Sequence, residues 1–260
     1  ENITFFNCAI YDTRIAGVAL EIVDGGKMYR VCVSNITMDN VGGPVFIRLG
    51  NRARAYKKDM GEIGVGSVKN ITISNIEATG ASPIGLSITG LEDHDVENVT
   101  LSNIRVRFKG GAGEKLAEKK VEEKEGGYPE YWMFGDLPSY GFFCRHVNNL
   151  KMHNIDLGFE KEDHRPAMIF DDVKGLDIFG FNGQMGSNAE SLIRFDNVQG
   201  AFVHGCKPGD NVKAFLKISG VLSDDISIMS NDFGDVVKPV ILSSQLKKDA
   251  VYLNFNRIKQ

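Results

Sequence analysis

Two carboxylates stand three residues apart at the end of an apolar segment. Glu21 and Asp24 lie in the sequence LEIVDGG, where Gly25 and Gly26 turn the chain directly after them. A glycine pair lets a backbone or a ligand approach closely, so both residues are candidates for substrate contact and for acid–base catalysis. The alternative is an aspartate that caps its own turn beside a solvent-facing glutamate.

A cationic cluster follows the next apolar segment. It consists of Arg48, Asn51, Arg52 and Arg54, with Lys57 and Lys58 after it. Guanidinium groups bind carboxylates through paired hydrogen bonds, so the first four residues are candidates for binding an anionic substrate. Solvated loop arginines are the alternative, and the two lysines are interpreted as solvating residues.

Aromatic residues concentrate between positions 128 and 143, directly after the charged stretch EKLAEKKVEEKE of residues 114–125. The charged stretch has too few apolar residues to bury a face, which predicts a mobile or helical excursion into solvent. Sugar rings pack on aromatic planes, so Tyr128, Tyr131 and Trp132 are candidates for carbohydrate contact. The alternative is that they pack this segment onto the body. Phe142 and Phe143 are expected on a strand, with at least one pointing inward.

The histidines and paired aspartates give no metal signal. His146 follows Arg145, His164 follows Asp163, and the five histidines have no HxH or HxxxH spacing, so neither a metal nor a cofactor is expected. Asp171-Asp172 and Asp224-Asp225 are interpreted as turn residues. The glycine-rich residues 110–115 lack the spacing and hydroxyl of a phosphate-binding loop.

Composition argues against nucleic acid and a lipid bilayer as partners. Thirty basic against 34 acidic residues give a net charge of −4, which provides no positive field for nucleic acid. The longest apolar runs are far shorter than the roughly 20 residues that span a bilayer, so no membrane segment is expected. Cys8, Cys32, Cys144 and Cys206 lie in strand-like runs without paired spacing, which favours buried free thiols over disulfides.

A repeat organises the elements that must position these residues. Segments such as NITFFNC, VCVSNIT, NITISNIE, NVTLSNIR and NLKMHNID alternate apolar and polar residues and then place an asparagine at one fixed point. Those asparagines are Asn7, Asn35, Asn75, Asn103 and Asn154, and Gly180, Gly205, Asn231 and Asn256 continue the series. The spacing is 25 to 28 residues, except at two insertions near residues 51–67 and 109–138.

Each unit also carries a second apolar segment, such as PVFIRL from Pro44 or AMIFDDV from Ala167. About nine units of short strands predict a single all-β domain over residues 1–260, a right-handed parallel β-helix or solenoid of about nine coils with two insertions. The alternative fold, a β-sandwich, predicts hairpin signals, but only one Asn-Gly pair occurs, at positions 182 and 183.

The repeat also predicts packing. Asn7, Asn35, Asn75 and Asn103 should stack along one edge, because asparagine tolerates the left-handed backbone of a tight corner and can bridge to neighbouring coils. The apolar positions of each unit should point inward, where successive coils bury them. They include Ile3, Val31, Val33, Ile71, Ile73, Val99 and Leu101.

Three segments carry a family resemblance. GVALEIVDGG from Gly17, VSNITMDNVGGPVFIRLGNR from Val33 and YPEYWMFGDLPSYGFFCRHV from Tyr128 resemble the C-terminal part of bacterial proteins of glycoside hydrolase family 28, the polygalacturonase and rhamnogalacturonase family. The resemblance extends from Asn2 to about Asp172. It implies inverting hydrolysis of galacturonic-acid or rhamnogalacturonan linkages in pectin, with carboxyls about 6.5–9.5 Å apart. It also implies an extracellular or periplasmic location in bacteria.

The chain departs from that family at its catalytic motifs. It has no Asn-Thr-Asp, Gly-His-Gly or Arg-Ile-Lys, and the segment most similar to the last reads Ala19-Leu20-Glu21. Because the sequence starts within a repeat unit, we expect the family's carboxylates upstream, with this chain supplying substrate-binding loops for a pectic polysaccharide. The second hypothesis is a non-catalytic carbohydrate-binding or structural solenoid. The sequence leaves the oligomeric state open.

Overall fold

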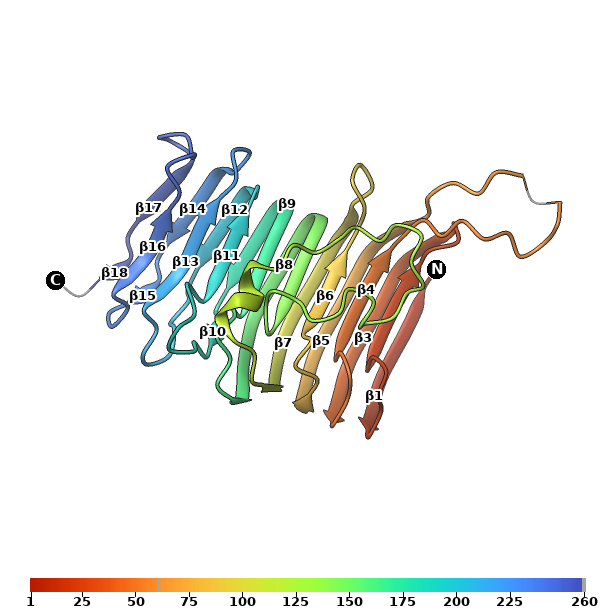
Figure 1. Ribbon diagram of the computed structural model, residues 1–260, viewed down its shortest axis with the longest axis horizontal. Helices are drawn as coiled ribbons and strands as arrows, with labels where there is room; N and C mark the ends of the chain where they lie inside the picture. The colour runs from red at the N-terminus through yellow and green to blue at the C-terminus, as the bar shows by residue number, and fades with distance from the viewer. Residues whose placement is uncertain (60, 259–260) are drawn as a thin grey trace.

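A computed structural model describes residues 1–59 and 61–258 of the chain. Every strand pairing in it is parallel, and strands of successive repeat units lie side by side in a 16-stranded sheet (Figure 1). Within these residues the helical structure is one 3₁₀ turn, η1 (Glu114–Glu118). The predicted all-β class and parallel pairing are therefore confirmed, and they are consistent with a β-helix or solenoid.

The sheet follows two paths. The first path takes the segments that contain or directly precede the repeated asparagine or glycine. They are β1 (Ile3–Tyr11), β3 (Lys27–Asp39), β5 (Ser67–Ala81), β7 (Val96–Gly110), β8 (Phe142–Lys161), β9 (Met168–Phe179), β12 (Gln199–His204), β14 (Asp224–Met229) and β17 (Val251–Asn254). The second path takes the other apolar segments: β2 (Val18–Ile22), β4 (Val45–Leu49), β6 (Leu86–Thr89), the first residues of β8 and β9, β11 (Ile193–Asp196), β13 (Ala214–Ser219) and β16 (Lys238–Leu242).

Three short strands complete the described structure. β10 (Asn182–Gly183) pairs with β8, and β15 (Asp232–Phe233) pairs with β18 (Arg257–Ile258). The strands β8 and β9 serve both paths because their backbones turn at His146 (φ 54°) and Asp172 (φ 50°).

The predicted asparagine ladder is confirmed. Each Nδ2 donates to the Oδ1 of the asparagine in the preceding unit, from Asn154 through Asn103, Asn75 and Asn35 to Asn7, at 2.9–3.1 Å. All five have φ between 53° and 57°. A second ladder, in which Asn149 donates to Asn98 and Asn98 donates to Asn70, runs along another edge.

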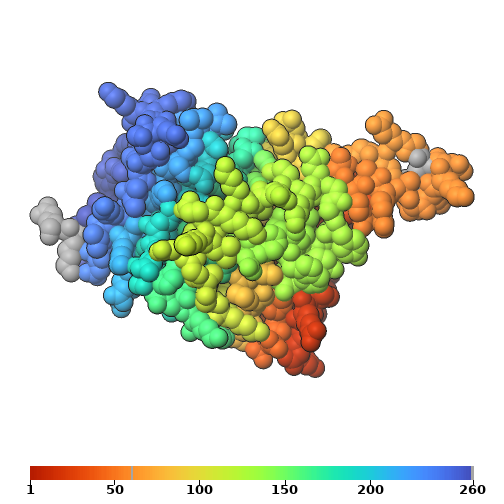
Figure 2. Space-filling model, in the orientation of Figure 1, coloured from red at the N-terminus to blue at the C-terminus, as the bar shows by residue number. Residues whose placement is uncertain are grey.

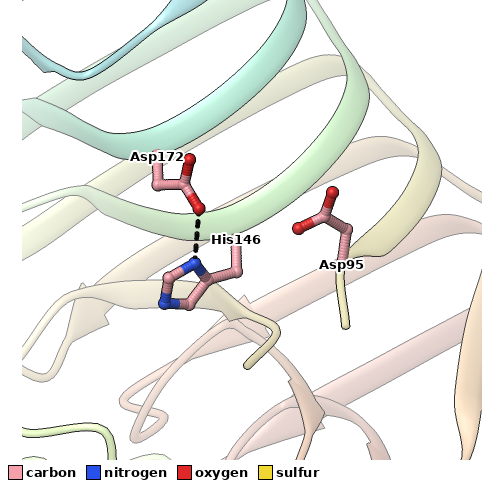
Figure 3. Close-up of side chains that lie close together, drawn as sticks. All are labelled: Asp95, His146 and Asp172. Atoms are coloured by element: carbon pink, nitrogen blue, oxygen red, sulfur yellow. Dashed lines mark hydrogen bonds and ion pairs between the residues drawn. The ribbon is translucent and has the colours of Figure 1, made fainter. Parts of the chain in front are cut away.

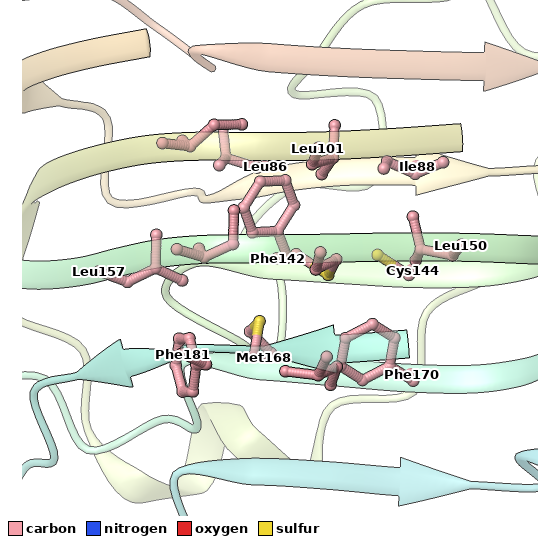
Figure 4. Close-up of a cluster of buried hydrophobic side chains, with 14 of the residues drawn as sticks. Leu86, Ile88, Leu101, Phe142, Cys144, Leu150, Leu157, Met168, Phe170 and Phe181 are labelled. Carbon is pink, nitrogen blue, oxygen red and sulfur yellow. The ribbon is translucent and has the colours of Figure 1, made fainter. Parts of the chain in front are cut away.

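The core consists of the inward apolar side chains of both paths (Figure 4). Six of the seven predicted inward residues are buried, from Val31 to Leu101. Ile3 is the exception at 46% exposed, because β1 is the outermost strand and has a neighbour on one side only. Phe142 points into the core, whereas Phe143 packs on the outer side with Phe134, Leu137 and Ile169.

The two insertions behave differently. The first, between β4 and β5, projects from the body as an arm (orange in Figures 1 and 2). The second, between β7 and β8, lies across the outer face of the second path (yellow-green in Figures 1 and 2). The expected excursion of residues 114–125 into solvent is therefore wrong: beyond η1 this stretch lies on the sheet, held by contacts described below.

All four cysteines are free thiols, as predicted, and Cys144 and Cys206 are buried. The predicted burial is wrong for Cys32, which is exposed, and Cys8 is only partly buried. Within residues 1–59 and 61–258, no helix is both long and apolar enough to cross a bilayer.

Candidate functional site

A row of polar side chains crosses the second path, with one residue contributed by each strand at the same register. From β2 to β13 the row reads Glu21, Arg48, Thr89, Arg145, Asp171, Asp196 and Ser219. Alternate residues of a strand point to opposite faces, so this row points out of the core toward the second insertion.

Three arginines hold the insertion on this face by donating to its main-chain carbonyls. We call residues 114–128 the crossing segment. Arg194 of β11 lies at one end of it, Arg145 in the middle and Arg48 nearer the other end. Their hydrogen bonds are Arg194 Nη1 to Ala117 O (2.9 Å), Arg145 to Val121 O (2.7 Å) and Glu122 O (3.2 Å), and Arg48 Nη2 to Glu123 O (2.9 Å) and Lys124 O (3.2 Å).

Arg48, a predicted substrate-binding residue, is fully buried. Its Nη1 donates to Thr89 Oγ1 (3.2 Å) and Gly90 O (3.0 Å), and its guanidinium lies 5.4 Å from the centre of the Phe134 ring. Burial lowers the pKa of Arg48 to about 10, so it stays charged at neutral pH. Its place in the structure is an anchor for the crossing segment.

A groove of about 460 Å³ lies between the crossing segment and the strands β8, β9, β11 and β13. Its basic lining residues are Lys119, Lys120, Arg145, Arg194 and Lys217, and its acidic ones are Glu118, Asp171 and Asp196. Phe143 and Ile169, which are 3% and 1% exposed, form its apolar floor. The volume falls within the range of about 300–1,000 Å³ typical of small-molecule sites.

Two carboxylates lie side by side in the groove. Asp171 and Asp196 are paired residues of β9 and β11. Both oxygens of Asp196 are engaged, by Ser219 Oγ and by Arg194 Nε (3.1 Å). Burial raises the pKa of Asp171, the charge of Asp196 adds to this, and Arg145 opposes it. Asp171 therefore holds a proton more readily than an ordinary aspartate does.

Arg52 and Asp24, both predicted site residues, form an ion pair with two hydrogen bonds. These hydrogen bonds lower the pKa of Asp24 to about 2, and the backbone N–H of Arg54 adds a third, to Oδ1 (3.0 Å). The Arg52 guanidinium also lies 5.1 Å from the centre of the Tyr128 ring. Tyr128 is 65% exposed, so its ring can receive a sugar.

The other predicted substrate-binding residues differ in how exposed their side chains are. The Arg54 side chain is exposed, whereas Asn51 donates its backbone N–H to Glu125 O (2.8 Å) and is partly buried. Trp132 is exposed and meets Tyr131 edge-on at 5.0 Å. Tyr131 packs on the body. Its ring lies so close to Gly43 that a Cβ on that glycine would be 3.0 Å from it.

Glu21 begins the polar row and is half-buried. Burial raises its pKa to about 6, and the charge of Glu130 adds to the effect. A carboxyl that titrates near pH 6 can act as a general acid. The structure thus places the two predicted carboxylates in opposite environments, with Asp24 firmly ionised and Glu21 protonated more readily.

Sequence reasoning missed a third grouping, at the corners of β8 and β9. His146 Nδ1 lies 2.7 Å from Asp172 Oδ2, and His146 Nε2 lies 3.2 Å from Glu123 Oε1. Asp95 completes a set in which one ligand atom from each of Asp95, His146 and Asp172 lies within 4.8 Å of the others. The spacing of 26 residues between His146 and Asp172 equals the repeat and could have placed them side by side.

The chain matches no protein-family model, and no curated protein matches it in sequence. The resemblance to glycoside hydrolase family 28 therefore rests on the sequence motifs alone.

Proposed function

We propose that this chain is a right-handed parallel β-helix of about nine coils that supplies the substrate groove of a pectin-directed glycoside hydrolase. The resemblance to glycoside hydrolase family 28 supports the substrate class, and the proposed location is extracellular or periplasmic. The observation that carries the proposal is the groove beneath the crossing segment, with its five basic side chains around an apolar surface.

This lining suits an acidic sugar. Uronate carboxylates accept hydrogen bonds from arginine and lysine, while the C–H faces of the ring pack on apolar side chains. Lys120 is exposed and has no hydrogen-bond or ion-pair partner among residues 1–59 and 61–258, so it is available to a ligand. Arg145 and Arg194 are held in place by the crossing segment, which lowers the entropy cost of binding.

The geometry favours binding over complete catalysis. An inverting pair needs carboxyls about 6.5–9.5 Å apart with room for a water molecule. Asp171 and Asp196 are on adjacent strands, whose backbones lie about 4.8 Å apart, and Asp196 is engaged by Ser219 and Arg194. Asp171 with its raised pKa fits a proton donor, but Asp196 beside it is not free to activate water, and the remaining acidic lining residue, Glu118, is an exposed residue of the 3₁₀ turn η1.

The exposed aromatic residues extend the same surface. Tyr128 closes the crossing segment, and Trp132 is exposed in the chain that returns from it. Tyr128, with the Arg52 guanidinium 5.1 Å from its ring centre, suits a further sugar unit of a long polysaccharide.

Isothermal titration calorimetry with trigalacturonate tests the proposal. We expect weak binding that falls with added salt, because exposed ion pairs are screened. Lys120→Ala should weaken binding about three- to fivefold, as loss of one exposed ion pair costs up to about 1 kcal/mol. Lys57→Ala, an exposed lysine of the first insertion, is the matched control. Absence of binding, or equal effects of the two variants, would overturn the proposed groove.

A reducing-end assay on polygalacturonate and rhamnogalacturonan separates binding from catalysis. We expect no release by this chain, because the family's Asn-Thr-Asp stretch is absent and a lost acid or base typically costs about 10²–10⁴-fold. Robust hydrolysis would contradict the binding role, and Asp171→Asn, Asp24→Asn and Glu21→Gln would then identify the acid. The absent motifs also favour the second candidate, a carbohydrate-binding solenoid without chemistry, whose parent protein would release no reducing ends.

A further inference from the structure

Asp95, His146 and Asp172 converge from three neighbouring elements. Asp95 directly precedes β7, and His146 and Asp172 lie at the corners of β8 and β9. One ligand atom from each lies within 4.8 Å of the other two, and His146 is 8% exposed (Figure 3). The Asp95 carboxylate is turned toward the other two groups in Figure 3.

The residue types at this corner differ from those at the same corner of the next two units. The same corner continues through Asn197 (φ 55°) and Gly220 (φ 87°) in the next two units. Asparagine and glycine are the residues that adopt a left-handed conformation most readily. Where the corner lies beside Asp95, it instead presents an imidazole and a carboxylate.

The second nitrogen of His146 is oriented as in metal sites. A histidine that ligates a metal through one ring nitrogen usually donates its other N–H to a carboxylate or carbonyl. Here Nε2 lies 3.2 Å from Glu123 Oε1, and Arg145 Nη1 holds the same oxygen at 3.2 Å. The other Glu123 oxygen, Oε2, is shielded from solvent and has no hydrogen-bond partner among the described residues. This leaves Nδ1 facing Asp172 and Asp95.

We propose that Asp95, His146 and Asp172 bind a divalent transition-metal ion through His146 Nδ1 and one oxygen of each aspartate. One imidazole nitrogen with two carboxylate oxygens suits Mn²⁺ or Zn²⁺ better than Ca²⁺ or Mg²⁺, which prefer all-oxygen sites. Binding releases to solvent the proton that His146 and Asp172 share at 2.7 Å. Lys174, whose Nζ lies 3.7 Å from Asp95 Oδ2, is half-exposed and can turn away.

The ion would tie three repeat units together at one corner. Through Glu123 it would also fix the crossing segment, and with it the roof of the groove. The site uses none of the groove carboxylates, so it stands whether or not the chain binds pectin.

Electron paramagnetic resonance of Mn²⁺ titrated into the metal-free full chain tests the site. Mn²⁺ is the probe because the exposed thiol of Cys32 competes for Zn²⁺. We expect one bound ion per chain. Asp95→Asn and Asp172→Asn should each weaken binding at least tenfold, and Glu123→Gln should weaken it about 10–100-fold through the orientation of His146.

Asp177→Asn is the matched control, since Asp177 pairs with His204 at 3.0 Å elsewhere on the sheet. Asp95 is partly exposed and ahead of its strand, so its variant should fold, and circular dichroism checks this. Absence of a saturable Mn²⁺ signal would overturn the proposal. So would equal Mn²⁺ affinity in the wild type, Asp95→Asn and Asp172→Asn.

Discussion

Replacement of Arg48 by methionine should loosen the crossing segment. The arginine is fully buried and donates four hydrogen bonds, two within the sheet to Thr89 and Gly90 and two to the carbonyls of Glu123 and Lys124. Methionine has a similar length and stays apolar, so the perturbation removes the donors without leaving a large cavity.

The size of the effect follows from these contacts. A hydrogen bond to a charged group contributes about 1.5–3 kcal/mol, but the desolvation of the guanidinium is recovered when the charge is removed. The crossing segment can move away from the sheet, so that its carbonyls form hydrogen bonds with water. Thr89 and Gly90 in the sheet cannot move in this way, and their hydrogen bonds are lost without replacement. We therefore expect Arg48→Met to lower the free energy of unfolding by about 3–5 kcal/mol, a large share of the total of about 5–15 kcal/mol typical of proteins.

Urea denaturation and limited trypsin digestion measure the two consequences. The crossing segment carries Lys115, Lys119, Lys120 and Lys124, so its release should speed cleavage there ahead of global unfolding. Arg54→Met, at an exposed arginine, is the control and should change neither measurement. A loss below about 0.5 kcal/mol with unchanged cleavage would refute the anchoring role of Arg48.

Two further predictions concern titration and the asparagine ladder. Because Glu21 holds its proton to about pH 6 in the folded protein but to 4.5 otherwise, stability should fall as pH rises through that window. Glu21→Gln should remove this slope in urea denaturation and gain about 1 kcal/mol at pH 7, after allowance for its partial exposure; an unchanged slope would contradict the assigned burial. Asn75→Ala should cost about 2 kcal/mol, from strain at φ 56° and two lost ladder hydrogen bonds. Asn75→Gly should cost about half as much by thermal denaturation, and equal losses would show that backbone strain plays no part.

The repeat carried most of the predictable structure. Spacings of 28, 40, 28 and 51 residues between the first asparagines reappear as the register of β1, β3, β5, β7 and β8, for example Val31 with Ile71. The prediction is correct because parallel strands of successive units pair in register, so that a residue type repeated once per unit lies beside the same residue type in the next unit. Ile3 fails the rule because the outermost strand has no neighbour on one side.

The crossing segment could not be predicted in the same way. It is held through main-chain carbonyls, which any sequence provides, and the arginines that reach them lie more than 70 residues away for Arg48 and Arg194. Its charged composition therefore predicted a segment that extends into solvent and not one that packs on the sheet. Asp172 was interpreted as a turn residue, and its backbone does turn (φ 50°), but within the continuous strand β9. The repeat also brings this corner beside the one at His146, and Glu123 reaches them only across the insertion.

A crystal structure of the chain with trigalacturonate tests the central claim most directly. The proposed function predicts sugar density beneath the crossing segment, with uronate carboxylates within about 3.2 Å of Arg194, Lys120 or Lys217. Density confined to Tyr128 and Trp132, or an empty groove in crystals that saturating ligand has reached, would contradict it.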